Sequence, residues 1–126
     1  MRLLLDSHAF LWWVTDDPKL GRAARREISN PESLVFVSAA SIWEITIKTA
    51  LGRLELGDED LVAEISENGF LELSIAARHA ERAGGLPRLH EDPFDRMLVA
   101  QAMLEGLTCV TRDPVFSKYN VATLWS

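Results

Sequence analysis

The sequence predicts an α/β fold, in which an open and mainly parallel sheet of about five strands is covered by helices on both faces. Short strand-like runs alternate with helix-like segments along the chain, as in repeated strand-helix-strand units. The runs are apolar throughout, as in LVFV at residues 34–37, which is typical of strands buried on both faces. A length of 126 residues suits one ordinary domain, so we expect a single domain over residues 1–126.

The first half of the chain contains two strand-to-helix units. The first strand is the apolar run at residues 2–5, and AFLWWV at residues 9–14 belongs to the helix that follows. An Asp-Pro pair predicts a second helix over residues 17–28, because aspartate caps a helix and proline fits its first turn. The second strand, residues 34–37, leads into a helix over residues 38–51 that a glycine ends.

The second half of the chain repeats this alternation and supplies the remaining strands. In chain order, we expect helix 58–68, strand 70–73, short helix 74–83, helix 92–105, strand 107–111, a short segment 114–119 and strand 121–125. In open parallel sheets, ligands bind at the carboxyl ends of the strands, where the winding direction reverses. The position of each polar side chain relative to that edge is therefore informative.

Composition and charge exclude several classes of protein. With 13 basic and 19 acidic residues the net charge is -6, which argues against a protein that binds nucleic acid through a broad basic surface. This argument weakens if the acids gather to hold divalent cations, which then supply the positive field. Cys109 is the only cysteine, so there is no intrachain disulfide, and no apolar run could span a membrane. We therefore expect a cytoplasmic protein without a membrane partner.

Three aspartates fall at positions where chemistry and helix capping compete as explanations. Asp6 directly follows the first strand and Asp113 follows the strand at residues 107–111, so both lie at carboxyl ends. Asp95 lies one turn into the helix that Asp92 and a proline begin, and it could serve the helix dipole alone. Chain order alone suggests that Asp95 lies at the opposite end of the sheet, unless the loop before its helix carries it across.

Glu44 is the most informative acid, because it stands within the apolar segment SIWEITI. A buried carboxylate is costly unless it is paired. Lys48, one helical turn later, could form a simple ion pair with it. Alternatively, Glu44 lines the ligand crevice. The sequence leaves both possibilities open.

If the four acids converge, they need a counter-ion. Unit charges about 4 Å apart repel by about 4 kcal/mol per pair at an effective dielectric constant near 20. A hard divalent cation, Mg²⁺ or Mn²⁺, would remove this penalty. The three histidines show no zinc-like spacing with the cysteine, so we interpret them as structural or substrate-side residues rather than ligands: His8, His79 and His90.

Taken together, these segments resemble the PIN domain, and within it the VapC-type toxins of bacterial toxin-antitoxin pairs. The resemblance covers essentially the whole chain, through LLLDSHAFLWW, VSAASIWEITIKTALGRLEL and HEDPFDRMLVAQAMLEGLTCVTRDPVF. It implies a three-layer α/β/α sandwich and a metal-dependent endoribonuclease that uses Mg²⁺ or Mn²⁺. It also implies an acidic quartet of Asp6, Glu44, Asp95 and Asp113, with Asp6, Asp95 and Asp113 as metal ligands.

The resemblance implies partners as well: an RNA substrate, a VapB-like antitoxin, and either a homodimer or a toxin-antitoxin hetero-oligomer. Four further residues are candidates for substrate binding or site support, although each could equally be a capping or surface group: Ser38, Arg96, Thr111 and Arg112. Two alternative functions remain at this point. One is a receiver-like signalling module, for which FLELSI lacks the expected acceptor aspartate, and the other is a catalytically silent PIN fold that only binds a partner.

Overall fold

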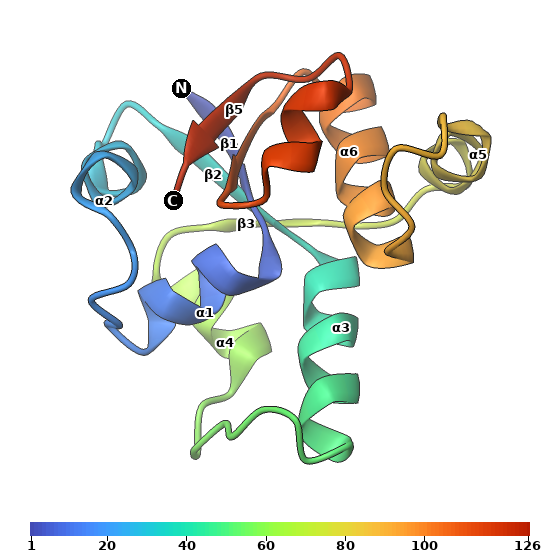
Figure 1. The fold of residues 1–126 in the computed structure, drawn as a ribbon. Helices are drawn as coiled ribbons and strands as arrows, with labels where there is room; N and C mark the ends of the chain where they lie inside the picture. Colours follow the sequence, from blue (N-terminus) through green and yellow to red (C-terminus); the bar gives the residue numbers. More distant parts are fainter.

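A computed structural model describes residues 1–126 and shows a five-stranded sheet in which every pair of neighbours is parallel (Figure 1). The elements in chain order are β1 (Arg2–Leu5), α1 (Ser7–Val14), α2 (Arg22–Ser29), β2 (Leu34–Ser38), α3 (Ala39–Ala50), α4 (Leu61–Glu67), β3 (Leu71–Leu73), α5 (Ala77–Gly85), α6 (Pro93–Glu105), β4 (Thr108–Thr111), the 3-10 helix η1 (Pro114–Lys118) and β5 (Thr123–Trp125). No helix is long and apolar enough to cross a membrane.

The strand order β3-β2-β1-β4-β5 places β1 at the centre of the sheet. The chain winds from β1 through β2 to β3 on one side, then crosses to β4 and β5 on the other. The winding direction therefore reverses between β1 and β4. The carboxyl ends of these two strands are the place where an open parallel sheet forms its ligand crevice.

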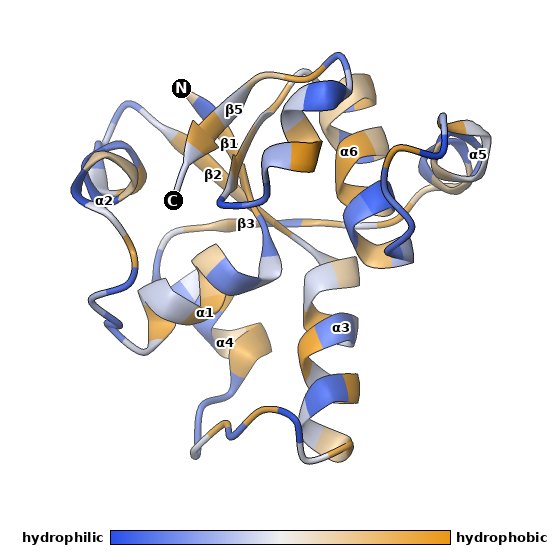
Figure 2. Cartoon of the chain, viewed as in Figure 1, coloured by the Kyte–Doolittle hydropathy of each residue, from blue (hydrophilic) through white to orange (hydrophobic).

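Two hydrophobic clusters cover the two faces of the sheet. Leu3 and Leu5 of β1 pack with buried residues of α1, α2 and α4 in one cluster. Leu4 points to the other face and packs with residues of α5, α6 and η1. All three leucines are fully buried, and most of the sheet is hydrophobic in Figure 2, while each long helix carries both polar and apolar residues. The predicted three-layer α/β/α sandwich is confirmed.

The start of the second helix differs from the prediction. Residues 17–20 form a turn, and α2 begins at Arg22 instead of residue 17. The Asp17 carboxylate accepts a hydrogen bond from the Lys19 backbone N–H, and this bond stabilises the turn. The Asp-Pro pair was therefore a turn signal and not a helix start. Similarly, α4 begins at Leu61 rather than at residue 58, because Asp60 caps it through the Ala63 N–H.

The direction of α6 corrects the placement of Asp95 by chain order. A helix that leads into a parallel strand must return from the carboxyl edge of the sheet to the amino edge, so its first turn lies at the carboxyl edge. The α6 helix runs this way before β4 and packs against α3 and α5. The start of α6 and the ends of β1 and β4 therefore lie at the same edge (Figure 1).

Candidate active site

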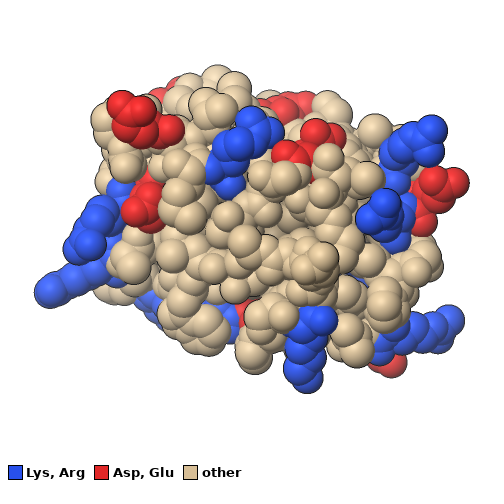
Figure 3. Space-filling model, turned by 90° about the horizontal axis from the view of Figure 1, so that it is seen from above, with Lys and Arg blue, Asp and Glu red and all other residues tan.

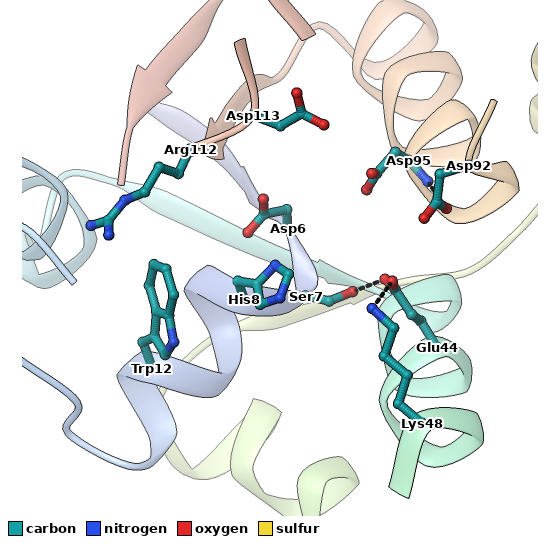
Figure 4. Close-up of a pocket in the computed structure, with 10 residues that line it drawn as sticks. All are labelled: Asp6, Ser7, His8, Trp12, Glu44, Lys48, Asp92, Asp95, Arg112 and Asp113. Atoms are coloured by element: carbon teal, nitrogen blue, oxygen red, sulfur yellow. Dashed lines mark hydrogen bonds and ion pairs between the residues drawn. The ribbon is translucent and has the colours of Figure 1, made fainter. Parts of the chain in front are cut away.

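A cavity of about 340 Å³ lies at this carboxyl edge. Only one of its lining residues is hydrophobic, Trp12, and the acids outnumber the basic residues (Figure 4). The lining consists of Asp6, Ser7, His8, Trp12, Glu44, Lys48, Asp92, Asp95, Arg112 and Asp113. The four acids of the expected quartet all line this one cavity, although they come from separate segments of the chain.

Asp6 caps a helix and also lines the cavity. One of its carboxylate oxygens accepts the Ala9 N–H at 2.8 Å and so caps α1. The residue is nevertheless 7% exposed and lines the cavity. Burial raises the pKa of Asp6, and the nearby Glu44 charge adds to this, while hydrogen bonds from Ala9 and Thr111 oppose it. The carboxylate is held in place by a cap and lies where a cation would stabilise its charge.

Glu44 combines the ion pair with a place in the cavity wall. Its side chain is 5% exposed, and Lys48 Nζ lies 2.9 Å from Oε2. Ser7 Oγ donates a hydrogen bond to the other oxygen, Oε1, at 2.5 Å. The hydrogen bond to Glu44 raises the pKa of Lys48. Both Glu44 oxygens therefore have protein partners, and the carboxylate fixes Ser7 and Lys48 at the wall.

Asp92 and Asp95 differ in what their carboxylates contact. Asp92 Oδ1 accepts the backbone N–H groups of Phe94 and Asp95, at 2.8 and 3.2 Å, and caps α6. Asp95 is not used as a cap and turns its carboxylate toward the cavity (Figure 4). Burial, followed by the charges of Asp92 and Glu44, raises the pKa of Asp95 to about 7. An acid in these surroundings is ionised at neutral pH only at a cost.

Asp113 meets Asp95 from the opposite side of the cavity. Its Oδ1 accepts the Val115 N–H at 2.9 Å and caps η1, while its Oδ2 lies 2.7 Å from His90 Nε2. The same nitrogen lies 3.0 Å from Asp95 Oδ2. One potential ligand atom from each of these three residues lies within 4.8 Å of the other two.

His90 is the residue that sequence reasoning missed. We excluded the histidines as ligands because their spacing is not zinc-like. That spacing does not show whether a histidine contacts the acids. The available signal was the position of His90 two residues before the cap of α6, in HEDPFD. The other two histidines differ, since His8 lines the cavity wall and His79 faces Glu105 Oε1 at 2.9 Å.

The four candidate substrate or support residues fall into two groups. Thr111 and Arg112 lie at the site: the Thr111 hydroxyl accepts the Asp113 N–H at 3.1 Å, and Arg112 lines the cavity. The Arg112 guanidinium lies 4.7 Å from the Trp12 ring centroid and donates to the Ser126 and Lys19 carbonyls. Ser38 is fully buried and caps α3 through the Ala40 N–H, outside the cavity lining.

Arg96 is also placed outside the cavity lining. Its guanidinium donates to four backbone carbonyls in the segment before α6, at distances from 2.9 to 3.1 Å. These acceptors belong to Ala83, Leu86, Pro87 and His90. Arg96 therefore anchors the loop between α5 and α6, and its donors do not face the cavity.

Replacing Arg96 by methionine should lower the free energy of unfolding by about 2 to 3 kcal/mol, because hydrogen bonds from a charged group are lost and carbonyls are left unpaired. Urea denaturation of wild type and Arg96→Met measures this difference. Arg88→Met, a change at an exposed position in the same loop, is the matched control and should be close to neutral. Equal stability of all three proteins would contradict the anchoring role.

The donor set fits a hard divalent cation. Carboxylate oxygens of Asp6, Asp95 and Asp113 are the ligands that Mg²⁺ and Mn²⁺ prefer. Burial raises the pKa values of Asp6 and Asp95, and neighbouring carboxylates add to this, Glu44 in both cases and Asp92 at Asp95; a cation would offset the cost of the ionised forms. The face seen in Figure 3 has separate Lys and Arg side chains in its upper part and around its margin, with Asp and Glu among them, and no continuous basic surface.

Comparison with known proteins agrees with this arrangement. The PIN domain family model matches residues 3–122, which include the whole cavity lining. Ribonuclease VapC22 from Mycobacterium tuberculosis (strain ATCC 25618 / H37Rv) is 30% identical over 116 residues, which cover 88% of this chain and 86% of that protein. The expected resemblance is therefore confirmed.

Two solved structures share the fold at lower sequence identity. The structure of VapBC2 from Rickettsia felis, bound to a DNA fragment from its promoter, matches this chain with a TM-score of 0.71 and 15% identity over 98% of both chains. A toxin-antitoxin complex from Klebsiella pneumoniae matches with a TM-score of 0.64 and 18% identity, over 98% of this chain and 96% of that one. The likeness of both structures extends over nearly the full length of the chain.

Proposed function

Because this chain belongs to the PIN domain family, we propose that it is a metal-dependent endoribonuclease of the VapC kind, which hydrolyses RNA phosphodiester bonds. The observation that carries the proposal is the convergence of Asp6, Glu44, Asp95 and Asp113 on one cavity. Several buried carboxylates around one space destabilise a fold unless a ligand compensates them. The similarity to a ribonuclease supports RNA hydrolysis as the reaction at this site.

Asp6, Asp95 and Asp113 would hold the cation, which we propose to be Mg²⁺ or Mn²⁺. A divalent cation in such a site lowers the pKa of water and neutralises charge that develops on the phosphate. Glu44 would act through the two groups that it holds, the Ser7 hydroxyl and the Lys48 ammonium. Lys48 places a positive charge on the cavity wall, where a phosphate oxygen would enter.

Thr111 and Arg112 would support the site from the end of β4. The Thr111 hydroxyl accepts the Asp113 N–H and so orients the turn that carries this acid. The Arg112 guanidinium is fixed by its contact with Trp12 and by backbone carbonyls. A positively charged group fixed at the rim would attract the phosphates that flank the one being cleaved.

The VapC kind of toxin also implies a partner. We propose that the chain pairs with a VapB-like antitoxin, alone or as part of a larger hetero-oligomer, or that it forms a homodimer. The structural relatives support this proposal, since they include a toxin-antitoxin complex. Free and antitoxin-bound protein should then differ in RNA cleavage.

The nature of the product ends tests the mechanism. With a pool of random-sequence single-stranded RNA and Mg²⁺, we expect products with a 5′-phosphate and a 3′-hydroxyl, and no cleavage in EDTA. A 2′,3′-cyclic phosphate formed without metal would show that the 2′-hydroxyl attacks and that the proposed mechanism is wrong. Antitoxin binding without any cleavage would instead favour a catalytically silent PIN fold.

A further inference from the structure

His90 occupies the space between two acids of the site without being one of its expected ligands. Its Nε2 lies 2.7 Å from Asp113 Oδ2 and 3.0 Å from Asp95 Oδ2. Its other ring nitrogen, Nδ1, accepts the Asp92 backbone N–H at 3.2 Å. Because Nδ1 accepts a hydrogen bond, the proton of the neutral ring lies on Nε2, which donates to Asp113 Oδ2, while Asp95 Oδ2 lies in contact with the same nitrogen.

The backbone of His90 is itself held from two sides. Its N–H donates to Tyr119 Oη at 2.9 Å, and its carbonyl accepts from Arg96 Nη1 at 3.1 Å. The same tyrosine hydroxyl donates to the Pro87 carbonyl at 2.8 Å, and Arg96 donates to that carbonyl as well. We call Arg96 and Tyr119 the loop clamp. These bonds hold both the N–H and the carbonyl of His90 in place.

We propose that His90 is a positioning residue of the acidic site, which donates to Asp113 and contacts Asp95 and so sets the two carboxylates at a spacing at which both can bind one cation. The loop clamp holds His90 in that place. This inference rests on the proposed function, because it assumes that these acids bind a cation. Asp95 and Asp113 come from different elements, α6 and the turn after β4, so a histidine that contacts both carboxylates couples segments that no backbone hydrogen bond joins.

Direct coordination by His90 is the competing interpretation, and the geometry disfavours it. Coordination through Nε2 would move the ring proton to Nδ1. That proton would then face the Asp92 N–H across 3.2 Å, with two donors directed at one another. As a donor to Asp113, His90 keeps both of its side-chain hydrogen bonds and orients the carboxylates from outside the coordination shell.

Calorimetric titration of the full chain with Mn²⁺ tests the inference. His90→Ala should raise the Kd for Mn²⁺ by about 10- to 100-fold, the usual cost of losing a group that orients metal ligands. His90→Gln should recover most of the affinity, because the glutamine amide N–H reaches the position of Nε2. Tyr119→Phe, which keeps His90 but loosens the loop clamp, should raise the Kd by about threefold.

His79 provides a matched control at the other end of α6. Its Nδ1 accepts the Ala76 N–H at 2.9 Å and its Nε2 faces the Glu105 carboxylate, so His79→Ala removes the same kinds of bond. Both alanine variants should lose thermal stability, and only His90→Ala should lose Mn²⁺ affinity. Equal Kd values for wild type, His90→Ala and Tyr119→Phe would overturn the inference while the proposed function stands.

Electron paramagnetic resonance of bound Mn²⁺ separates positioning from coordination. We expect no nitrogen hyperfine coupling of the strength that a directly bound imidazole gives. Such a coupling in wild type, lost in His90→Gln, would overturn the positioning role and assign His90 as a ligand. A wild-type protein that binds no Mn²⁺ at all would overturn the proposed metal-dependent function, on which the inference rests.

Discussion

Asp95→Asn is expected to reduce RNA cleavage by at least about a hundredfold, while the cation-free variant is as stable as the wild type or more stable. Asp95 is half-buried near Asp92, Glu44 and Asp6, and its partial burial together with these charges raises its pKa to about 7. Asparagine keeps the shape of the side chain and removes the charge, so repulsion falls while a metal ligand is lost. The rate of RNA cleavage with Mg²⁺ tests the loss of activity. The melting temperature in EDTA, measured on the same preparations, tests the stability of the cation-free variant.

Asp6→Asn should show the same separation of activity from stability. Asparagine caps helices about as well as aspartate, so the bond from the Ala9 N–H to the side chain persists. Asp60→Asn is the matched control, because Asp60 caps α4 in the same way at an exposed position outside the cavity lining. If Asp6 and Asp95 served only as helix-start residues, all three variants would retain cleavage and lose little stability.

The second large effect is a fall in the stability of the cation-free protein as pH rises. Asp95 has a folded-state pKa of about 7, above its ordinary value of 3.8, so the folded protein binds the proton more tightly than the unfolded chain does. The contribution of Asp95 to the free energy of unfolding is fully present below about pH 4 and is lost as the pH rises through about 7. The slope approaches about 1.4 kcal/mol per pH unit, for a total of about 4 kcal/mol.

Burial raises the pKa of Asp6 as well, and this acts in the same direction. The charges that shift the pKa of Asp95 are those of Asp92, Glu44, Asp6 and His90, and of these only His90 lowers it. Urea denaturation in EDTA between pH 5 and pH 8 measures the slope, and Asp95→Asn should remove most of it. Saturating Mn²⁺ should flatten or reverse the trend, because the cation binds the ionised carboxylates. A flat profile in EDTA would contradict the description of Asp95 as an acid destabilised by burial.

Much of the fold followed from local sequence signals. The apolar runs of β1 and β2 predicted strands buried on both faces, and Leu3, Leu4 and Leu5 are fully buried. The α3 and α6 helices were predicted to within a residue or two, because Ser38, Asp92 and Gly106 are capping residues whose chemistry acts within one turn. The placement of Asp6 and Asp113 also followed from the sequence, because Asp6 directly follows β1 and Asp113 comes two residues after the end of β4.

Local signals were misleading where two structures use the same residues. Asp17 and the proline after it are compatible with both a turn and a helix start. The turn forms because the Lys19 backbone N–H donates a hydrogen bond to the Asp17 carboxylate. Glu44 could pair with Lys48 or line the cavity, and in the structure it does both. Arg96 and Ser38 looked available for substrate, but backbone partners occupy their polar groups.

The sequence by itself determined which segments become strands and helices, and which acids follow a strand, because hydrophobic period and capping depend on neighbours in the chain. Only the tertiary structure decided that Asp95 reaches the cavity and that His90 lies between Asp95 and Asp113. Those contacts depend on the direction in which α6 crosses the sheet and on bonds from Arg96 and Tyr119 that fix the preceding loop. Such contacts join residues that are far apart in the chain, so they stabilise the protein only after the segments that carry them have packed together.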